Sequence, residues 1–388
     1  MSGHLGDMTV ALDVPTARPT GAAVSVRSVA RRSASAVLRH GRFALGVAGT
    51  VVLLAVVLPA VAGIPWSGIV ATLTSVPPLV MVGLVGLWAV GLALHTIALT
   101  AALPGLSAWR AASLSLTGSA VANVLPVGGA AGVALNYKMA RTWGFDARAM
   151  TRFTVVSNVW DVLAKVALPV VALPLLVAAG IGAQPLLVTG VTAVVATLVL
   201  AAVAVVLVRP AAAAAVGRAM DRVVARVRRR GAMAGVGEVA PVPVTWELRM
   251  AELQADTLDL VRHRWGRLSL GMALYTSALL ALMVACFAAT GAGLPLGVVL
   301  TAFVLERLLT LAGLTPGGAG LVEVAVTGLL VSLGAAAGTA AAGILLYRAL
   351  TMALEVPVGG TWLLAWVSLR LRGQRRTAAL GAAVGIEA

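Results

Sequence analysis

The chain has 388 residues, of which 60% are hydrophobic and only 11% are charged, and its mean hydropathy is +1.00. A soluble protein is usually about half apolar and about a quarter charged, so the polar side chains here are too few to cover a soluble fold. The composition favours helices that span a bilayer, because the apolar runs are about 20 residues long and lack the alternation of barrel strands.

The net charge of +15 comes mainly from 27 arginines, most of which lie in short segments between apolar runs. The positive-inside rule places such segments in the cytoplasm. With three Tyr and five Phe, the chain lacks aromatic residues for base stacking, so we expect no nucleic-acid partner. The single Cys286 excludes an intrachain disulfide, and the scattered histidines and cysteine predict no metal and no cofactor. We expect His95, inside an apolar run, to be a packing residue.

The first half of the chain opens with a basic leader, residues 1–43, that we expect to be disordered. A first membrane half, 44–208, follows, and its apolar runs predict spans at 44–63, 78–103, 153–180 and 185–208. The segment from Arg110 to Arg152 is only partly hydrophobic and has basic residues at both flanks. Because both flanks should be cytoplasmic, this segment is predicted to enter the membrane and return.

The second half begins after a basic loop, 209–267, which the run Arg228-Arg229-Arg230 marks as cytoplasmic. A second membrane half is predicted at 268–370 and a cytoplasmic tail at 371–388. The apolar segments of this half are 268–290, 297–314, 321–335 and 338–369. The pattern predicts an all-α bundle with six full crossings and two re-entrant pairs, or seven or eight crossings if the last segments divide differently. Both termini of this multi-pass inner-membrane protein would be cytoplasmic.

Two similar glycine turns lie about half a chain apart, at Leu125-Pro126-Val127-Gly128-Gly129-Ala130 and Leu314-Thr315-Pro316-Gly317-Gly318-Ala319. Proline and paired glycine end helices, and backbone groups freed at membrane depth must be buried in protein or line a wet cavity. By the predicted topology, the first turn is entered from the cytoplasm and the second from outside. This indicates an inverted repeat with a midplane site, although a chain with 42 glycines also produces such a match by chance.

Ionisable residues inside apolar segments cost ~3 kcal/mol each at a helix centre, so we expect them to be paired. Asp161 and Lys165 are four residues apart and predict a structural pair on one helix face. Glu306 and Arg307 are adjacent, so they should point to different faces and need separate partners. Glu323 and Arg307, which flank the second turn, are the best candidates for contact with a charged substrate.

Longer stretches around both turns form a recognisable pattern. The run Thr315-Pro316-Gly317-Gly318-Ala319-Gly320-Leu321-Val322-Glu323 precedes a helix of small residues and then Leu345-Leu346-Tyr347-Arg348. In the first half, Asn123-Val124-Leu125-Pro126-Val127-Gly128-Gly129 precedes a basic loop with Lys138 and Arg141 and the segment from Asn158 to Asp161. Over roughly residues 40–370, the chain resembles the lysylphosphatidylglycerol synthase transmembrane (flippase-like) family. The resemblance implies a multispanning domain that moves or flips lipids.

Two departures from that family limit what the resemblance implies. Nothing after residue 370 could form the aminoacyl-transferase domain of fused members, so we do not expect synthesis of aminoacylated lipid. Asn158 and Val159 stand where many relatives carry an acidic-basic pair before the aspartate.

We therefore expect a lipid flippase-like transporter rather than an enzyme. Its substrate would carry an anionic headgroup, as in an aminoacyl-phospholipid or a polyprenyl-phosphate-linked sugar. Backbone N–H groups after each turn would hold the phosphate, and nearby arginines would neutralise it. The expected partners are membrane lipids with anionic headgroups, and a homo-oligomer stays open. The candidate substrate-binding residues are Gly128, Gly129, Arg141, Arg307, Pro316, Gly317, Gly318, Gly320, Glu323 and Arg348.

Two other functions stay open. A membrane-embedded transferase acting on a lipid-linked substrate would need a carboxylate base, for which Asp161 and Glu323 are the available pair. A non-transporting scaffold would work through the basic loop 209–267. Deleting part of that loop separates the two classes, because a scaffold would lose its function while a transporter would keep its basal flux.

Overall fold

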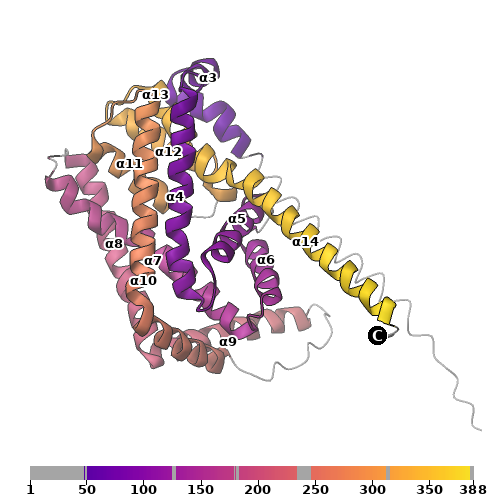
Figure 1. Cartoon of the computed structure of the whole chain (residues 1–388). Coiled ribbons are helices and arrows are strands. Elements are labelled where there is room, and N and C mark those ends of the chain that lie inside the picture. Colours follow the sequence, from indigo (N-terminus) through magenta and orange to yellow (C-terminus); the bar gives the residue numbers. More distant parts are fainter. Residues whose placement is uncertain are drawn as a thin grey trace, which may run out of the picture. The chain divides into compact units, whose positions relative to one another are not determined.

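The structure is a computed structural model that describes residue 48 and residues 50–384, apart from 125–127, 179, 181–182, 234–245 and 312–314. The predicted leader, 1–43, and the Leu-Pro-Val segment of the first glycine turn lie outside these residues. The described part consists of helices and short turns, with no strand in it (Figure 1). The predicted all-α membrane bundle is confirmed.

The N-terminal part of the described chain is a sharply bent pair of helices. A helix from Thr50 passes through the π turn η1 (Leu53–Val57) into α2 (Leu58–Ala62), and α3 (Trp66–Thr74) follows at 88° to it. Gly63 adopts a left-handed φ of 65° at the end of α2, a conformation that glycine takes without steric cost. Pro65 then precedes α3 and cannot continue a helix.

Helices α4 (Pro78–Ala102) and α10 (Trp246–Ala289) run antiparallel along the bundle (Figure 1). Small residues make this close approach feasible. A Cβ placed on Gly91 would lie 3.5 Å from the Ala278 Cβ, and one on Gly271 would lie 2.5 Å from the Ala98 backbone nitrogen. Membrane helices associate through such small residues because the backbones can then approach closely.

Helices α5 (Ala108–Val124) and α6 (Gly128–Thr142) form an antiparallel first hairpin. Its tight packing also depends on glycine, since a Cβ on Gly132 would lie 2.7 Å from the Gly118 carbonyl oxygen. The hairpin begins at the end of the α4–α10 pair where α4 ends. Helix α14 covers the hairpin, and a Cβ on Gly359 would lie 2.2 Å from the Leu116 carbonyl oxygen.

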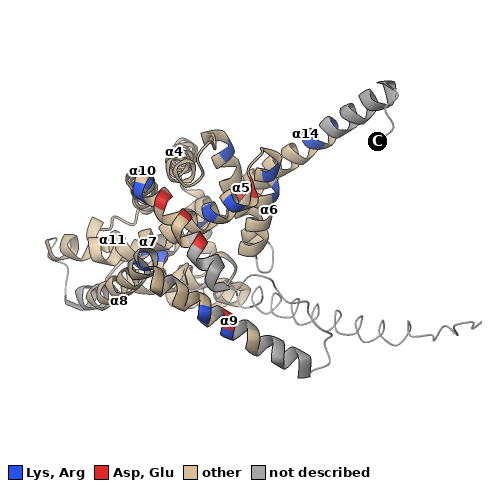
Figure 2. Ribbon diagram, turned by 90° about the horizontal axis from the view of Figure 1, so that it is seen from below, with Lys and Arg blue, Asp and Glu red and all other residues tan. Residues whose placement is uncertain are grey.

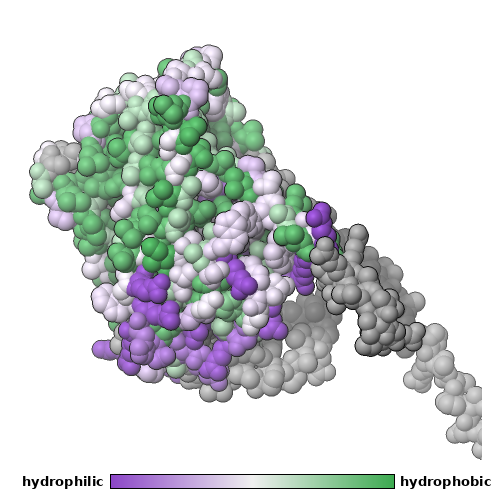
Figure 3. Space-filling view, in the orientation of Figure 1, coloured by the Kyte–Doolittle hydropathy of each residue, from purple (hydrophilic) through white to green (hydrophobic). Residues whose placement is uncertain are grey.

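Helices α7 (Ala147–Ala178), α8 (Ala183–Val208) and α9 (Pro210–Met233) come next. The predicted loop 209–267 is largely helical, since α9 fills its first part and α10 begins at Trp246. Alanine and arginine favour helix, which explains why this polar segment is not an irregular loop. Hydrophilic side chains gather at this end, and Figure 3 shows them below a largely apolar surface. Figure 2 views the protein from that end and shows Lys, Arg, Asp and Glu on several helices.

The second hairpin consists of α11 (Leu296–Leu309), the short helix η2 (Pro316–Gly318) and α12 (Leu321–Ser332). It starts after α10 ends, so the two hairpins begin at opposite ends of the α4–α10 pair (Figure 1). Helix α13 (Ala337–Arg348) then continues through the π turn η3 (Ala349–Ala353) into α14 (Glu355–Val384). The aromatic core between α10, α11 and α13 contains Phe287, Phe303 and Tyr347.

Four described helical segments are long and apolar enough to cross a membrane: Pro78–Ala102, Ala147–Ala178, Gln254–Ala289 and Ala337–Arg372. The bent N-terminal pair is a fifth candidate if it counts as one span. The last segment is thus one continuous stretch rather than two short spans. The predicted six to eight crossings and the re-entry of the two hairpins depend on where the bilayer lies, and they stay predictions.

Candidate functional site

Three glycines of the second turn hold left-handed backbone conformations. Gly317, Gly318 and Gly320 have φ angles of 59°, 75° and 83°. Other residues adopt this region only at a steric cost, so the turn depends on glycine at these positions. The turn ends where Glu323, in the first turn of α12, accepts a hydrogen bond of 2.6 Å from the Gly320 N–H. This contact supplies the acidic half of a capping box, and it fixes where α12 begins.

Four side chains form a buried ion-pair network around this turn: Glu306, Arg307, Glu323 and Arg348. Arg348 Nε donates to Glu323 Oε1 at 3.0 Å, and its Nη1 reaches Glu306 Oε1 at 3.4 Å. The same guanidinium donates to the Gly317 carbonyl oxygen. Two guanidinium groups and two carboxylates give the network no net charge. Its arginines are engaged with the protein's own acceptors.

The expectation that Glu306 and Arg307 need separate partners is wrong, because Arg307 Nη2 donates to Glu306 Oε1 at 2.6 Å. Adjacent helical residues point about 100° apart, but the long arginine side chain reaches back to the neighbouring carboxylate. A buried carboxylate requires a nearby cation, and this requirement outweighs the directions in which the two side chains leave the helix. Arg307 also donates to Tyr347 Oη at 3.1 Å.

The two π turns clamp the second glycine turn. A Cβ on Gly320 would lie 2.8 Å from the Leu53 Cβ of η1, and one on Gly317 would lie 2.7 Å from Met352 Cε of η3. Thr50 Oγ1 donates to the Ala319 carbonyl oxygen at 3.3 Å. Because π turns are uncommon and occur frequently at functional sites, their convergence here marks the turn as a specialised part of the fold.

The tip of the first hairpin reaches the second glycine turn. Asn123 lies in the last turn of α5, and its Oδ1 would be 3.2 Å from a Cβ placed on Gly317. Helix α5 and η2 are in contact, although they are about half a chain apart in the sequence. The two turn regions that the sequence singles out are therefore brought together.

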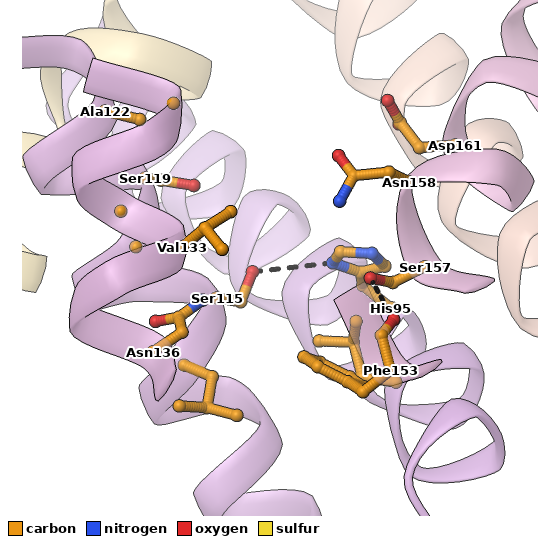
Figure 4. Close-up of a pocket in the computed structure, with 15 residues that line it drawn as sticks. His95, Ser115, Ser119, Ala122, Val133, Asn136, Phe153, Ser157, Asn158 and Asp161 are labelled. Carbon is orange, nitrogen blue, oxygen red and sulfur yellow. Dashed lines mark hydrogen bonds between the residues drawn. The ribbon is translucent and has the colours of Figure 1, made fainter. Parts of the chain in front are cut away.

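A polar cavity of about 280 Å³ lies between the first hairpin, α4 and α7 (Figure 4). Its polar lining comes from His95, Ser115, Ser119, Asn136, Ser157, Asn158 and Asp161. Apolar and small residues, including Gly129 of the first glycine turn, complete the wall. Such a set of hydroxyl, amide and carboxylate groups is expensive within apolar helices unless it faces water or a ligand.

Contacts in the wall hold the polar groups in place. Lys165 Nζ donates to Asp161 Oδ2 at 2.8 Å, which confirms the pair predicted from their spacing. His95 lies 3.5 Å from Ser115 Oγ through Nδ1, and its ring stacks on Tyr275 with the centroids 4.3 Å apart. His95 is thus a stacked and hydrogen-bonded residue at the cavity.

The cavity and the ion-pair network are joined by the helix that follows Arg348. Helix α14 packs against α5, which carries Ser115 and Ser119 of the cavity wall. Arg348, at the end of α13, anchors the second turn. One continuous helical segment therefore contacts both features.

The same region of the chain matches a known protein family. A family model described as "Lysylphosphatidylglycerol synthase TM region" matches residues 43–359. The chain belongs to this family. The match covers both hairpins, the polar cavity and the ion-pair network, and it links this membrane protein to lipid handling. No curated protein matches the chain.

In this lysylphosphatidylglycerol synthase TM region, the predicted site residues divide into three groups. Arg307, Gly317, Gly318, Gly320, Glu323 and Arg348 belong to the second turn and its ion-pair network, and Pro316 begins η2. Gly129 lines the polar cavity, and Gly128 begins α6 beside it. Arg141 is exposed in the last turn of α6 and lies outside both features. The structure thus brings most of them to one turn.

Sequence reasoning missed most of the cavity wall. Ser115, Ser119 and Asn136 belong to a segment whose sequence indicates only partial hydrophobicity and basic flanks, and no pattern in the sequence marks Ser157. The spacing of the serines could have identified the wall, because Ser115 and Ser119 are four residues apart and so share one face of α5. Polar residues aligned on one face of a helix in an apolar chain indicate a cavity.

A second cavity, of about 410 Å³, lies beside α7, α8 and α10. Its wall is mainly apolar, with Leu163, Ala167 and Val171 on α7 and Leu200 on α8. Trp160 also borders it and donates through Nε1 to Ser269 Oγ at 3.2 Å. Helix α7 therefore borders both a polar and an apolar cavity. No cluster of metal-ligating side chains occurs in the described ranges.

Proposed function

We propose that this protein moves a membrane lipid across the bilayer by receiving the lipid headgroup in the polar cavity. The observation that carries the proposal is the cavity itself, a hydrogen-bonding pocket between the first hairpin and two of the helices that are apolar enough to span a membrane, α4 and α7. A headgroup that crosses hydrocarbon loses its hydration, so it needs replacement hydrogen bonds along the route. The family match supports a role in lipid handling.

The two hairpins suit this task because their tips meet inside the bundle. Irregular backbone at membrane depth is a feature of transporters, where it lines the substrate path. The ion-pair network then acts as a framework. It secures the second glycine turn against the first hairpin while leaving no net charge near the path.

Other parts of the same helices are proposed to contact lipid outside the polar cavity. A hydrocarbon chain of the moved lipid would occupy the apolar cavity beside α7. At the basic end of the bundle, Lys138 and Arg141 are exposed on α6 and would contact anionic lipids of the surrounding leaflet. The predicted partnership with anionic lipids is thus proposed for the membrane surface, apart from the moved headgroup.

No chemical conversion of the lipid is part of the proposal. A transferase would need a carboxylate base free to act, and the two candidates are Asp161 and Glu323. Asp161 pairs with Lys165, and Glu323 pairs with Arg348 and caps α12. These contacts favour structural roles for both carboxylates.

The proposal is tested by filling the polar cavity. Ala122 lines it, so Ala122→Phe should block the headgroup and lower protein-dependent lipid movement in reconstituted vesicles at least about tenfold, or about 1.4 kcal/mol in barrier height. Movement is measured as the fraction of a fluorescent lipid that a membrane-impermeant reductant reaches over time.

The matched control is Ala89→Phe on the exposed face of α4. It adds the same ring outside the cavity and should leave the rate within a factor of about two. Equal rates for both variants and the wild type would remove the cavity from the path of the lipid.

A further inference from the structure

The hydrogen-bonding polarity of the cavity wall indicates the chemical class of the headgroup, if the proposed transport holds. On α7, Ser157 Oγ donates to the Phe153 carbonyl at 2.8 Å, and Asn158 Nδ2 donates to the Thr154 carbonyl at 2.7 Å. A hydroxyl has one hydrogen to donate, so Ser157 offers the cavity only its lone pairs. Asn158 retains its carbonyl oxygen and its second N–H.

The opposite wall carries groups that both donate and accept hydrogen bonds, namely the Asn136 amide on α6 and the Ser115 and Ser119 hydroxyls on α5. Figure 4 shows Asn136 on the hairpin wall, across the cavity from Asn158 and Asp161 on α7. A headgroup that both donates and accepts therefore suits the cavity better than one that only accepts.

The charge of the wall narrows the class further. The ionisable lining residues are His95 and Asp161, and the Asp161 carboxylate already pairs with Lys165 at 2.8 Å. No Arg or Lys is among the cavity-lining residues in the described part of the chain. An ionised phosphate brings negative charge, and no cationic side chain of this wall offsets it. An ammonium group supplies donors but would need an unpaired carboxylate.

We infer that the polar cavity takes an uncharged polyhydroxyl headgroup, such as the sugar of a glycolipid. Hydroxyl groups both donate to and accept from the polar groups of the two walls, and they carry no charge into the bundle. The volume of about 280 Å³ lies at the small end of ligand pockets, which run to ~1,000 Å³, and suits a single sugar ring. Asn136, Asn158 and Asp161 would be the specificity-determining residues.

The test compares three lipids in vesicles of phosphatidylcholine that contain the full-length protein. Each vesicle preparation carries a trace of one chain-labelled fluorescent lipid: monoglucosyl diacylglycerol, phosphatidylethanolamine or phosphatidic acid. The glucosyl lipid should move at least about tenfold faster than either phospholipid, relative to protein-free vesicles. Equal rates for all three lipids, or faster movement of either phospholipid, would overturn the polyhydroxyl assignment while leaving lipid transport intact.

Two variants test whether Asn158 and Asn136 determine the preference for the glucosyl lipid. Asn158→Leu and Asn136→Leu should each reduce movement of the glucosyl lipid at least about tenfold, because each leaves a sugar hydroxyl unpaired. Thr361→Leu is the matched control, since Thr361 is exposed on α14 and bonds only to its own helix. A glucosyl-lipid rate unchanged in both asparagine variants would contradict the assignment.

A binding measurement separates this inference from the proposed transport. In detergent, excess monoglucosyl diacylglycerol should raise the melting temperature of the wild type and of Thr361→Leu, and should not raise that of Asn158→Leu. Phosphatidic acid should have no such effect. Selective binding without movement of any lipid would support the headgroup class and contradict transport. A melting temperature that does not respond to the glucosyl lipid would contradict the class.

Discussion

At the scale of single residues, Arg348 has the most connected side chain at the second turn. Its guanidinium contacts two carboxylates and a backbone carbonyl, and it is 7% exposed. Arginine suits this position because its planar fork offers several donors in fixed directions. Arg307, Glu323 and Arg348, which the sequence marks as substrate contacts, are therefore paired within the protein.

Removing one member of this network should destabilise the fold. Glu323→Gln leaves Arg348 with one carboxylate instead of two and weakens the cap of α12, so we expect a loss of about 3–5 kcal/mol. The melting temperature in detergent measures this loss. If Glu323 instead served to bind substrate, the variant would keep its melting temperature and lose lipid movement.

The matched control for that variant is the exposed pair of Arg148 and Asp256. Arg148 Nη2 donates to Asp256 Oδ1 at 2.8 Å, but its side chain is 71% exposed. Solvent screens such pairs, so Arg148→Gln should shift the melting temperature much less than Glu323→Gln. A comparable shift in both variants would show that burial does not decide the strength of these ion pairs.

Sequence spacing foretold some residue contacts and missed others for a physical reason. Asp161 and Lys165 are a local pair, and the helix alone sets their distance. Arg348 reaches Glu306 and Glu323 across more than 20 positions, so only the packing of α11, α12 and α13 determines those contacts. The polar wall of the cavity combines side chains of four separate helices, so no local spacing predicts it.

At the scale of helices, glycine controls how closely neighbours approach. The glycines at positions 132, 271 and 359 each face the backbone of another helix at a distance that excludes a Cβ. In the run Pro357-Val358-Gly359-Gly360, it is Gly359 that has this packing role, because a Cβ on Gly360 would meet nothing within 4 Å. The two glycine turns could be located from the sequence, whereas their contact through Asn123 depends on the whole bundle.

The first hairpin offers a direct test of this packing. Gly132→Ala places a methyl group 2.7 Å from the Gly118 carbonyl oxygen, so the two helices must separate. Overpacking of this kind costs about 1–3 kcal/mol, and here it should also distort the polar cavity and slow lipid movement. The melting temperature and the vesicle assay measure the two effects.

Gly86→Ala is the corresponding control on α4. A Cβ at Gly86 meets nothing within 4 Å, and its backbone φ is ordinary for a helix. Alanine has the higher helix propensity by up to about 1 kcal/mol, so this variant should be as stable as the wild type or more so. Equal losses in both variants would argue against a specific contact at Gly132.

At the scale of the whole described molecule, the polar and apolar surfaces separate as a membrane protein requires. Hydrophilic residues gather at the end that holds α9 and the first part of α10, and apolar side chains cover much of the remaining face in Figure 3. The sequence predicted this separation because charge and hydropathy are local properties. The number of crossings was harder to predict, since short helices can pair into hairpins instead of spanning.

The orientation can be tested with single cysteines. Ala147 lies at the basic end beside Arg148, and Ala336 lies at the opposite end before α13. A membrane-impermeant maleimide should label Ala336→Cys in intact cells and Ala147→Cys only in inverted vesicles. The native Cys286 is fully buried and should react little in either preparation. Labelling of both sites from the same side would contradict the predicted topology.

The π turn η3 changes the direction in which the side chains of the last helix point around its axis. A π turn accommodates about one more residue than an α turn, so the helix beyond it is rotated by roughly 100° relative to an uninterrupted helix. With this offset, Arg348 contacts the second glycine turn while Gly359 lies against the Leu116 backbone of the first hairpin. Deleting one residue within 349–353 would restore a regular helix and turn Gly359 away from α5. One helical segment thus contacts both hairpins through a local change of winding.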